Sequence, residues 1–289
     1  MSLTRLDPAV PDDAVLDATP EPAVRLVGGA MVLGGRTVWS DVDVTVGTGE
    51  FVAVLGPNGV GKSTLIKAIL GLLPLTAGTL TVLGETAGRA NQHIGYLPQR
   101  RSFDPGLRIR GVDVVRLGLD GHRWGLPLPR RRARTGAASG DRVAEMIRLV
   151  GATEYARRPI GQVSGGEQQR LLIAQALVQE PRLLLLDEPL DSLDLPNQAS
   201  VAALVADICQ TGVTVMLVAH DVNPIPGYLD RVIYLAHGGA VEGRPEEVIT
   251  SETLSRLYDT PIEVLRTRDG QPVVVGQPEA PAHHHDRHP

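Results

Sequence analysis

Cysteine, aromatic residues and long apolar runs are all scarce in this 289-residue sequence. Cys209 is the only cysteine, so no disulfide can form within the chain, and a reducing compartment suits it. Only 3% of the residues are aromatic, which leaves leucine, valine, isoleucine and alanine to fill the interior. The longest apolar stretches, such as residues 183–186, are far shorter than the ~20 residues of a membrane-spanning helix. Any membrane role therefore has to come through a partner.

The first residues and the overall charge narrow the class of protein further. Residues 1–22 are rich in aspartate, proline and alanine and lack a basic start followed by an apolar run. We therefore expect a flexible leader there and not a secretory signal. The 28 basic against 33 acidic residues give a formal charge of −5, which argues against a nucleic-acid partner. With 43% hydrophobic residues, the rest of the chain has enough apolar surface to fold.

Strand-like and helix-like patterns alternate along most of the chain. The apolar run 51–55 lies between two glycines and predicts a buried strand, and residues 62–73 predict a helix that ends before Pro74. Strands that alternate with helices favour a mainly parallel α/β sheet. We interpret residues 100–160 as a helical insertion in this core. The same patterns predict strands at 42–46, 183–186, 213–218 and 231–235, and helices at 112–117, 142–150, 167–179, 199–209 and 245–257.

A glycine-rich loop is the first motif with a chemical meaning. Residues 56–63 match G-x-x-x-x-G-K-[ST], with a predicted strand before them and a predicted helix after them. Gly59 and Gly61 let successive backbone N–H groups converge on an anion, and the helix N-terminus adds its positive end. Lys62 would then reach the β- and γ-phosphates of a nucleotide, and the Ser63 hydroxyl would bind Mg²⁺. The alternative is a turn with a surface lysine. The predicted nucleotide-binding residues are Gly56, Pro57, Asn58, Gly59, Val60, Gly61, Lys62, Ser63 and Thr64.

Two adjacent carboxylates, Asp187 and Glu188, follow the apolar run 183–186. In a parallel sheet, ligands bind at the carboxyl ends of the strands, and neighbouring side chains of a strand point in different directions. We therefore expect Asp187 to hold the Mg²⁺ shell and Glu188 to orient an attacking water. An Asp-Glu loop that merely follows a core strand is the alternative.

The segment Val163-Ser164-Gly165-Gly166-Glu167 resembles the signature of ATP-binding cassette (ABC) proteins, usually written LSGGQ. Val163 stands in place of the leucine and Glu167 in place of the glutamine. In that family the segment opens a helix and presents its serine and glycine amides to the γ-phosphate held by the opposite subunit. Ser164 as an N-cap with Glu167 in a capping box is a structural role for the same residues, and the two roles are compatible.

Further positions match the family in the expected order, between about residues 23 and 248. The resemblance implies that Gln99 senses Mg²⁺ and that His220 contacts the γ-phosphate. It also implies that the loop Ser192-Leu193-Asp194 crosses a dimer interface. Leu33 stands where many members stack an aromatic side chain on adenine. The implied catalytic residues are Glu188, His220 and Gln99, and the implied Mg²⁺-site residues are Ser63, Gln99 and Asp187.

The resemblance implies a fold and a function as well. The fold is an α/β P-loop NTPase of the ABC type, with a RecA-like core, an antiparallel β subdomain and a helical subdomain at about 100–160. Two copies would close head to tail on two ATP, with Mg²⁺ as cofactor. Their cycle would drive separate integral-membrane permease subunits from the cytoplasmic face of the cell membrane, served indirectly by an extracytoplasmic substrate-binding protein.

The resemblance also indicates a cargo. Residues 219–224, residues 100–104 and the closing helix are similar to motor subunits of zinc and manganese importers, so we expect a divalent metal. The alternatives are an iron chelate, another small solute, or a non-transport cassette ATPase. Cassette proteins of translation carry two cassettes in one chain, and cassette ATPases of DNA repair carry a long insertion between the phosphate loop and the signature. This sequence has neither feature.

The remaining segments have weaker signals. Residues 102–119 are the predicted contact surface for a permease. We expect residues 249–266 to form a C-terminal helix and extension, and residues 267–289 to form a flexible tail. The histidines of that tail either bind divalent metal or are incidental. The arginines of the loop at 118–140 lie in solvent or contact anionic lipid headgroups. These side chains are His283, His284, His285 and His288 in the tail, and Arg130, Arg131, Arg132 and Arg134 in the loop.

Overall fold

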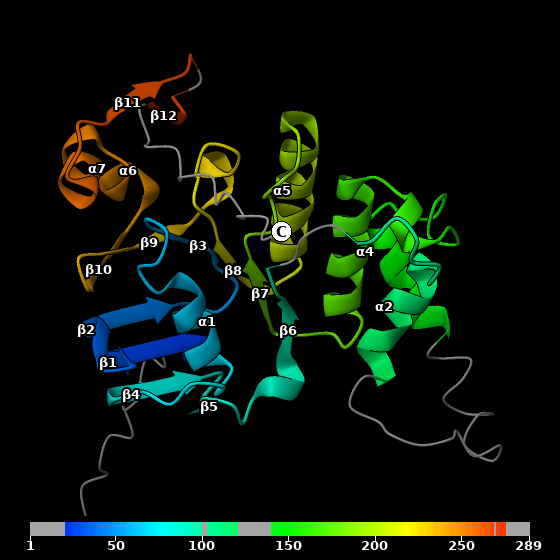
Figure 1. Cartoon of the computed structure of the whole chain (residues 1–289), viewed down its shortest axis with the longest axis horizontal. Coiled ribbons are helices and arrows are strands. Elements are labelled where there is room, and N and C mark those ends of the chain that lie inside the picture. Colours follow the sequence, from blue (N-terminus) through cyan, green and yellow to red (C-terminus); the bar gives the residue numbers. More distant parts are fainter. Residues whose placement is uncertain (1–20, 100–102, 121–139, 269, 276–289) are drawn as a thin grey trace, which may run out of the picture.

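A computed structural model describes residues 21–99, 103–120, 140–268 and 270–275 of the chain. Within these ranges, six strands form one sheet in the order β10-β9-β3-β8-β7-β6 (Figure 1). Neighbours from β9 to β6 run parallel, and only β10 is antiparallel to its neighbour, so the predicted mainly parallel sheet is confirmed. The strands are β3 (Phe51–Leu55), β6 (Ile94–Leu97), β7 (Leu183–Asp187), β8 (Thr214–Val218), β9 (Arg231–Ala236) and β10 (Gly239–Gly243).

A second sheet is antiparallel and lies on the side of the first that α1 (Lys62–Ile69) covers (Figure 1). Its order is β2-β1-β4-β5, with β1 (Val24–Leu33), β2 (Arg36–Val46), β4 (Ala77–Val82) and β5 (Glu85–Thr86). One apolar cluster joins both sheets to the helix, through side chains such as Val44, Val54 and Ile66. The helix ends at Ile69 and not at residue 73 as predicted, because Gly71 turns left-handed, with φ 68°, and its N–H bonds the carbonyl of Ala68.

The opposite face of the parallel sheet carries a second apolar cluster. Leu184 and Leu186 of β7 point into it, whereas Leu183 and Leu185 point toward α1, as alternation along a strand requires. Burial on both faces explains the unbroken apolar run of this strand. The elements on this face are α4 (Gly165–Leu177), α5 (Leu195–Gln210), α2 (Gly111–Asp120) and a helix at 140–149.

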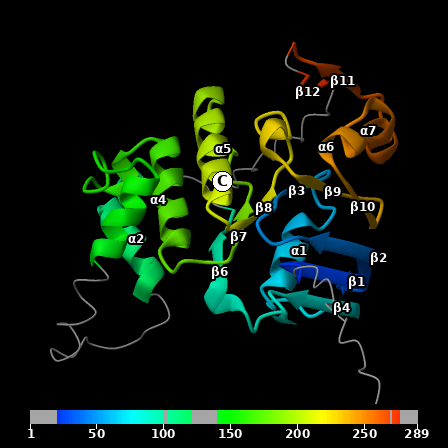
Figure 2. The same cartoon turned by 180° about the vertical axis from the view of Figure 1, so that it is seen from behind.

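The helices α2 and α4 lie at the end of the molecule away from the antiparallel sheet (Figure 2). The helix α2 lies within the region 100–160 that was predicted to be a helical insertion, and α4 follows that region. Short 3-10 helices cover Asn91–His93, Ile160–Gln162 and Pro226–Tyr228. No helix in the described part of the chain is long and apolar enough to cross a bilayer.

The C-terminal region differs from the sequence prediction. One helix at 245–257 was expected, but there are two, α6 (Pro245–Val248) and α7 (Ser251–Tyr258). The prediction is wrong because Ile249 leaves helical geometry and Thr250 caps the second helix, its hydroxyl accepting from the N–H of Thr253 at 3.2 Å.

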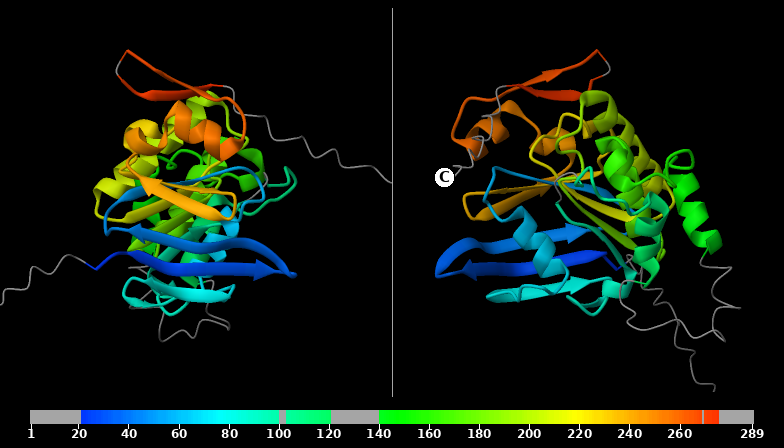
Figure 3. Two further views of the ribbon diagram at one scale, coloured as in Figure 1. Left: turned by 90° about the vertical axis from the view of Figure 1, so that its left-hand side faces the viewer. Right: turned by 45° about the vertical axis from the view of Figure 1, so that its right-hand side comes forward.

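A hairpin follows these helices and lies over them (Figure 3). It consists of β11 (Glu263–Arg266) and β12 (Pro272–Val275), so a strand occupies part of the predicted tail 267–289. The side-chain amide of Asn223 clamps this strand, because it accepts from the N–H of Val274 at 2.8 Å and donates to its carbonyl at 3.2 Å. The predicted arginine cluster and the four tail histidines lie outside the described residues.

Candidate functional site

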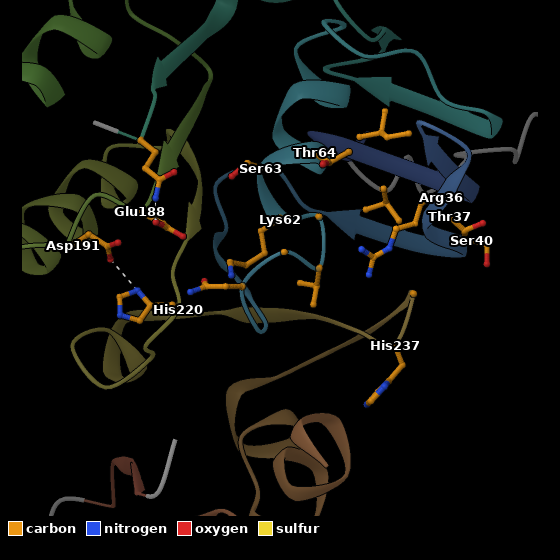
Figure 4. A pocket seen from close by; sticks show the side chains of 18 residues that line it. Arg36, Thr37, Ser40, Lys62, Ser63, Thr64, Glu188, Asp191, His220 and His237 are labelled. Atoms are coloured by element: carbon orange, nitrogen blue, oxygen red, sulfur yellow. Dashed lines mark hydrogen bonds and ion pairs between the residues drawn. The ribbon is translucent and has the colours of Figure 1, made fainter. Parts of the chain in front are cut away.

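A cleft of about 1230 Å³ opens beside the carboxyl ends of the central strands, and most of the predicted phosphate loop meets Gln99, Glu188 and His220 there (Figure 4). One end is polar and charged, and the other is formed by β2 and the turn between β9 and β10. The residues that line the cleft are Leu33, Arg36, Thr37, Val38, Ser40, Asn58, Gly59, Val60, Gly61, Lys62, Ser63, Thr64, Gln99, Glu188, Asp191, His220, His237 and Gly238.

The loop at 56–63 joins β3 to α1 in a conformation that needs glycine. Gly56, Gly59 and Gly61 all have positive φ, at 142°, 81° and 101°. A Cβ on Gly56 would lie 2.2 Å from the carbonyl oxygen of Leu235, and one on Gly61 would lie 2.9 Å from the ring of Trp39. The loop therefore approaches the neighbouring strands more closely than any side chain would permit, and the first amides of α1 open into the cleft.

Lys62 is folded back over this loop. Its ammonium donates to the carbonyls of Gly56 at 2.7 Å and Pro57 at 3.1 Å, and only 5% of the residue is exposed. Burial lowers the pKa of Lys62, although the carboxylates of Glu188 and Asp187 oppose the change. A buried cation next to convergent amides is suited to an anion.

Ser63 and Asp187 bring the loop and β7 together. The Ser63 hydroxyl donates to Oδ1 of Asp187 at 3.2 Å, and Asp187 is 4% exposed. Burial raises the pKa of the Asp187 carboxyl, and the Ser63 bond acts against the rise. The Ser63 hydroxyl and the Asp187 carboxylate together place oxygen atoms of the kind that bind a metal ion beside Lys62.

Glu188 follows the last residue of β7, and its side chain lines the cleft (Figure 4). Its side chain accepts a hydrogen bond from the amide of Gln99, so the two predicted residues are in contact. Burial raises the pKa of the Glu188 carboxyl from 4.5 to about 7, and the neighbouring Asp191 adds to the rise. Its backbone is left-handed, with φ 52°.

His220 contacts a residue that the sequence analysis did not single out. Its Nδ1 lies 2.9 Å from Oδ1 of Asp191 (Figure 4), and Asp191 is close enough to the Glu188 carboxyl for each to affect the charge of the other. The bond to Asp191 raises the pKa of His220, against the effect of burial. The sequence shows only that an acidic residue lies three positions after Glu188. That spacing does not predict a contact with His220, because the contact depends on the folded loop.

The other end of the cleft lacks an aromatic platform among the described residues that line it. Leu33 is 40% exposed there, next to Arg36. His237 reaches the cleft from the β9–β10 turn, which is attached to β2 by a bond from the Ser40 N–H to the Gly238 carbonyl at 2.8 Å. This end can accept a flat, partly apolar group.

The signature segment lies elsewhere. Of the described residues that line the cleft, none belongs to 163–167. The capping box is present: the Ser164 hydroxyl accepts from the N–H of Glu167 at 3.3 Å, and the Glu167 carboxylate accepts from the N–H of Ser164 at 2.8 Å. Leu193 and Asp194 follow at the start of α5, where Asp194 is the N-cap and accepts from the N–H of Asn197 at 2.9 Å. The N-terminus of α4 therefore does not line the cleft formed by the same copy of the chain.

Known proteins of similar sequence are ATP-binding subunits. The chain is 34% identical over 233 residues to a manganese transport system ATP-binding protein of Bacillus subtilis, covering 81% of this chain and 91% of the relative. It is 36% identical over 223 residues to a zinc transport system ATP-binding protein of Treponema pallidum, covering 77% and 82%.

Solved structures of similar fold are cassettes too. One is a chain of an inward-facing transporter described as a metal-chelate type ABC transporter, with a TM-score of 0.74, 26% identity, and 89% and 99% coverage of this chain and that one. Another is a dimeric ATP-binding cassette with ADP and Pi bound in a post-hydrolysis state, with a TM-score of 0.61, 26% identity, and 77% and 98% coverage. The family model described as "ABC transporter" matches residues 39–191. The chain has the fold, the phosphate loop and the acidic strand end of an ATPase cassette, and it belongs to the ABC transporter family.

Proposed function

We propose that this chain is the ATP-hydrolysing subunit of an importer for a divalent metal, zinc or manganese, and that residues 23–248 form its ATPase unit. The observation that carries the proposal is a cleft with one charged end, around Lys62, Glu188 and Asp191, and one open end beside Leu33. The charged end suits the triphosphate of a nucleotide, and the open end suits its adenine base. The names of the manganese and zinc relatives support the cargo.

The phosphates of ATP would lie over the loop at 56–63. Asn58, Gly59 and Gly61 line the cleft, and the positive φ of the two glycines turns amides toward it. Lys62 would leave the carbonyls of Gly56 and Pro57 and bind the β- and γ-phosphates, which are better partners for an ammonium than neutral carbonyls are. Thr64 and Val60 complete this wall.

The oxygen donors beside Lys62 fit a magnesium ion. Mg²⁺ prefers oxygen ligands, and the Ser63 hydroxyl and Asp187 carboxylate already lie within hydrogen-bond distance of one another. Ser63 and Gln99 would hold the ion, with Asp187 beside them. When bound, the ion would offset the charge of the phosphate oxygens.

Hydrolysis would use Glu188, Gln99 and His220. The Glu188 carboxylate would orient the attacking water, and the bond from Gln99 fixes the direction of that carboxylate. His220 lines the same cleft and would contact the γ-phosphate, where positive charge stabilises the transferring group.

A second copy of the chain would complete the site. Residues 163–167 lie outside their own cleft, so the amides of Ser164, Gly165 and Gly166 would face the γ-phosphate of the partner, once the Ser164 N–H leaves the Glu167 carboxylate to which it donates here. The loop of Ser192, Leu193 and Asp194 would run along the same interface. Val163 and Glu167 hold the segment, through core packing and the capping box.

The assembly would work on the cytoplasmic face of the membrane, bound to permease subunits through the helical subdomain. An extracytoplasmic binding protein would deliver the metal to those permeases. To test the cargo, the chain and the permease encoded with it are reconstituted in vesicles. ATP-dependent uptake of zinc or manganese is expected, whereas uptake of an iron chelate alone would contradict the proposal.

The ATPase assignment is tested with Glu188→Gln. The variant should bind ATP, hydrolyse it at least about 100-fold more slowly, and accumulate a dimer, because the water loses its base while the phosphate contacts stay. Size-exclusion chromatography with and without ATP measures the dimer, and phosphate release measures turnover. A variant that stays monomeric and fully active would exclude this role for Glu188.

A further inference from the structure

Asp191 is a charged side chain of the cleft to which no motif gives a role. It follows β7 in a tight turn, in which Glu188 and Ser192 both have positive φ, 52° and 62°, and the N–H of Asp191 donates to the Glu188 carbonyl at 3.3 Å. This turn directs the Asp191 side chain back into the cleft. There its Oδ1 lies 2.9 Å from Nδ1 of His220.

An incidental surface ion pair is the simplest alternative, and such pairs contribute little to stability. Two observations argue against it. Asp191 lines the cleft together with His220 and Glu188, and it binds His220 there while it acts on the charge of Glu188. The side chains of Asp191 and His220 are 33% and 51% exposed, so the contact is partly shielded from solvent on the Asp191 side.

The contact decides which hydrogen-bonding group His220 can offer. With Nδ1–H bound to a carboxylate, Nε2 is the only ring nitrogen left for a ligand. In a neutral ring, that Nε2 has no proton and can only accept, which is unsuited to a phosphate oxygen. In a doubly protonated ring, Nε2–H donates and adds a positive charge.

We propose that Asp191 is the positioning residue of His220: it fixes Nδ1–H and keeps the ring doubly protonated, so that Nε2–H donates to the terminal phosphate of ATP. The inference rests on the phosphate contact that the proposed function gives to His220. The charged groups that act on the ring agree with it. Hydrogen bonding by Asp191 raises the pKa of His220, and the carboxylates of Glu188 and Asp221 add to the rise. Lys62 faces Asp191 and favours its ionised form.

The test compares Asp191→Asn with the control Asp221→Asn. Both remove one negative charge near His220, but Asp221 instead accepts from the N–H of Asn223 at 2.9 Å. Asparagine at 191 can still accept from Nδ1–H, so the fold of the turn is kept. Nuclear magnetic resonance of 15N-histidine-labelled protein, with His220 assigned from His220→Gln, follows the ring nitrogens against pH. Asp191→Asn should lower the protonation midpoint by about one pH unit, since an opposite charge is lost, and the control should lower it clearly less.

Steady-state ATP hydrolysis gives the second readout. Asp191→Asn should lower kcat about tenfold and leave KM within about twofold, because the charge matters most for the transferring phosphoryl group. The control should keep kcat within about twofold. The double variant Asp191→Asn/His220→Gln should be no slower than His220→Gln alone.

The outcomes separate the two ideas. An unchanged His220 midpoint in Asp191→Asn, equal effects of the two asparagine variants, or additive losses in the double variant would each overturn the inference and leave the proposed function intact. A fully active His220→Gln would overturn the role of His220 in the proposed function, and this inference with it.

Discussion

Removing the charge of Glu188 should stabilise the nucleotide-free protein at alkaline pH, although the same change is expected to slow ATP hydrolysis. Burial raises the pKa of this carboxyl to about 7, so the folded state disfavours the ionised form. The wild-type chain therefore loses stability as the pH rises from about 4.5, the value for an unfolded glutamate, through about 7. Glutamine has no charge at any pH, and Glu188→Gln avoids this loss.

The size of the effect follows from the shift. A rise from 4.5 to about 7 corresponds to about 3 kcal/mol, at about 1.4 kcal/mol for each tenfold change in proton affinity. Glu188 is partly exposed, and solvent screening reduces this to about 1–2 kcal/mol. For a domain of this size, that gain raises the melting temperature by about 2–6 °C at pH 8. Below about pH 4.5 both states are protonated and the gain disappears.

Thermal unfolding followed by circular dichroism at pH 5 and pH 8, without nucleotide or magnesium, measures the effect. The matched control is Glu154→Gln, an exposed glutamate of the helical region, which should give the same small difference at both pH values. If the difference between Glu188→Gln and wild type were the same at pH 5 and pH 8, or if the variant were less stable at pH 8, then burial would not be raising this pKa.

Three further predictions concern binding and backbone shape. Lys62→Ala should weaken ATP binding at least about 100-fold by calorimetry, because a charge-assisted contact is lost. The control Lys67→Ala, at an exposed position of the same helix, should bind ATP with the wild-type affinity. Equal ATP affinities of the two variants would argue against phosphate binding by the loop at 56–63. Leu33→Tyr should tighten ATP binding about three- to tenfold, since a ring at the open end of the cleft can stack on the base, and unchanged affinity would place the base elsewhere. Gly56→Ala should cost about 2–4 kcal/mol in chemical denaturation, because its Cβ would lie 2.2 Å from a backbone oxygen. Gly212→Ala, at positive φ but in open space, should cost only about 1 kcal/mol, and equal losses would refute the steric argument.

Much of the fold is readable in the sequence because the core strands are buried on both faces. The predicted strand at 51–55 is β3 to the residue, and the run at 183–186 lacks only the last residue of β7. Such runs are apolar throughout and end at glycine or acidic residues, so their limits are local properties.

The errors come from contacts that the sequence does not display. Residues 246–257 include no glycine or proline to mark the break, at which Ile249 leaves helical geometry and Thr250 caps the second helix. The strand β12 looks like a valine-rich tail until Asn223 binds it from about fifty residues away in the chain. Asp191 was missed for the same reason, since its partner His220 belongs to another loop.

The left-handed backbone at Glu188 limits what can replace this residue. A residue with φ 52° that is not glycine already costs about 1 kcal/mol, and a branched Cβ such as that of valine, isoleucine or threonine would cost more. In saturation mutagenesis of this position, the stability of each variant would therefore depend first on how readily its residue adopts a positive φ. Asparagine, aspartate and glycine should destabilise the fold least. The amount of folded protein therefore has to be measured together with ATPase activity before an inactive variant is used as evidence that Glu188 orients the attacking water.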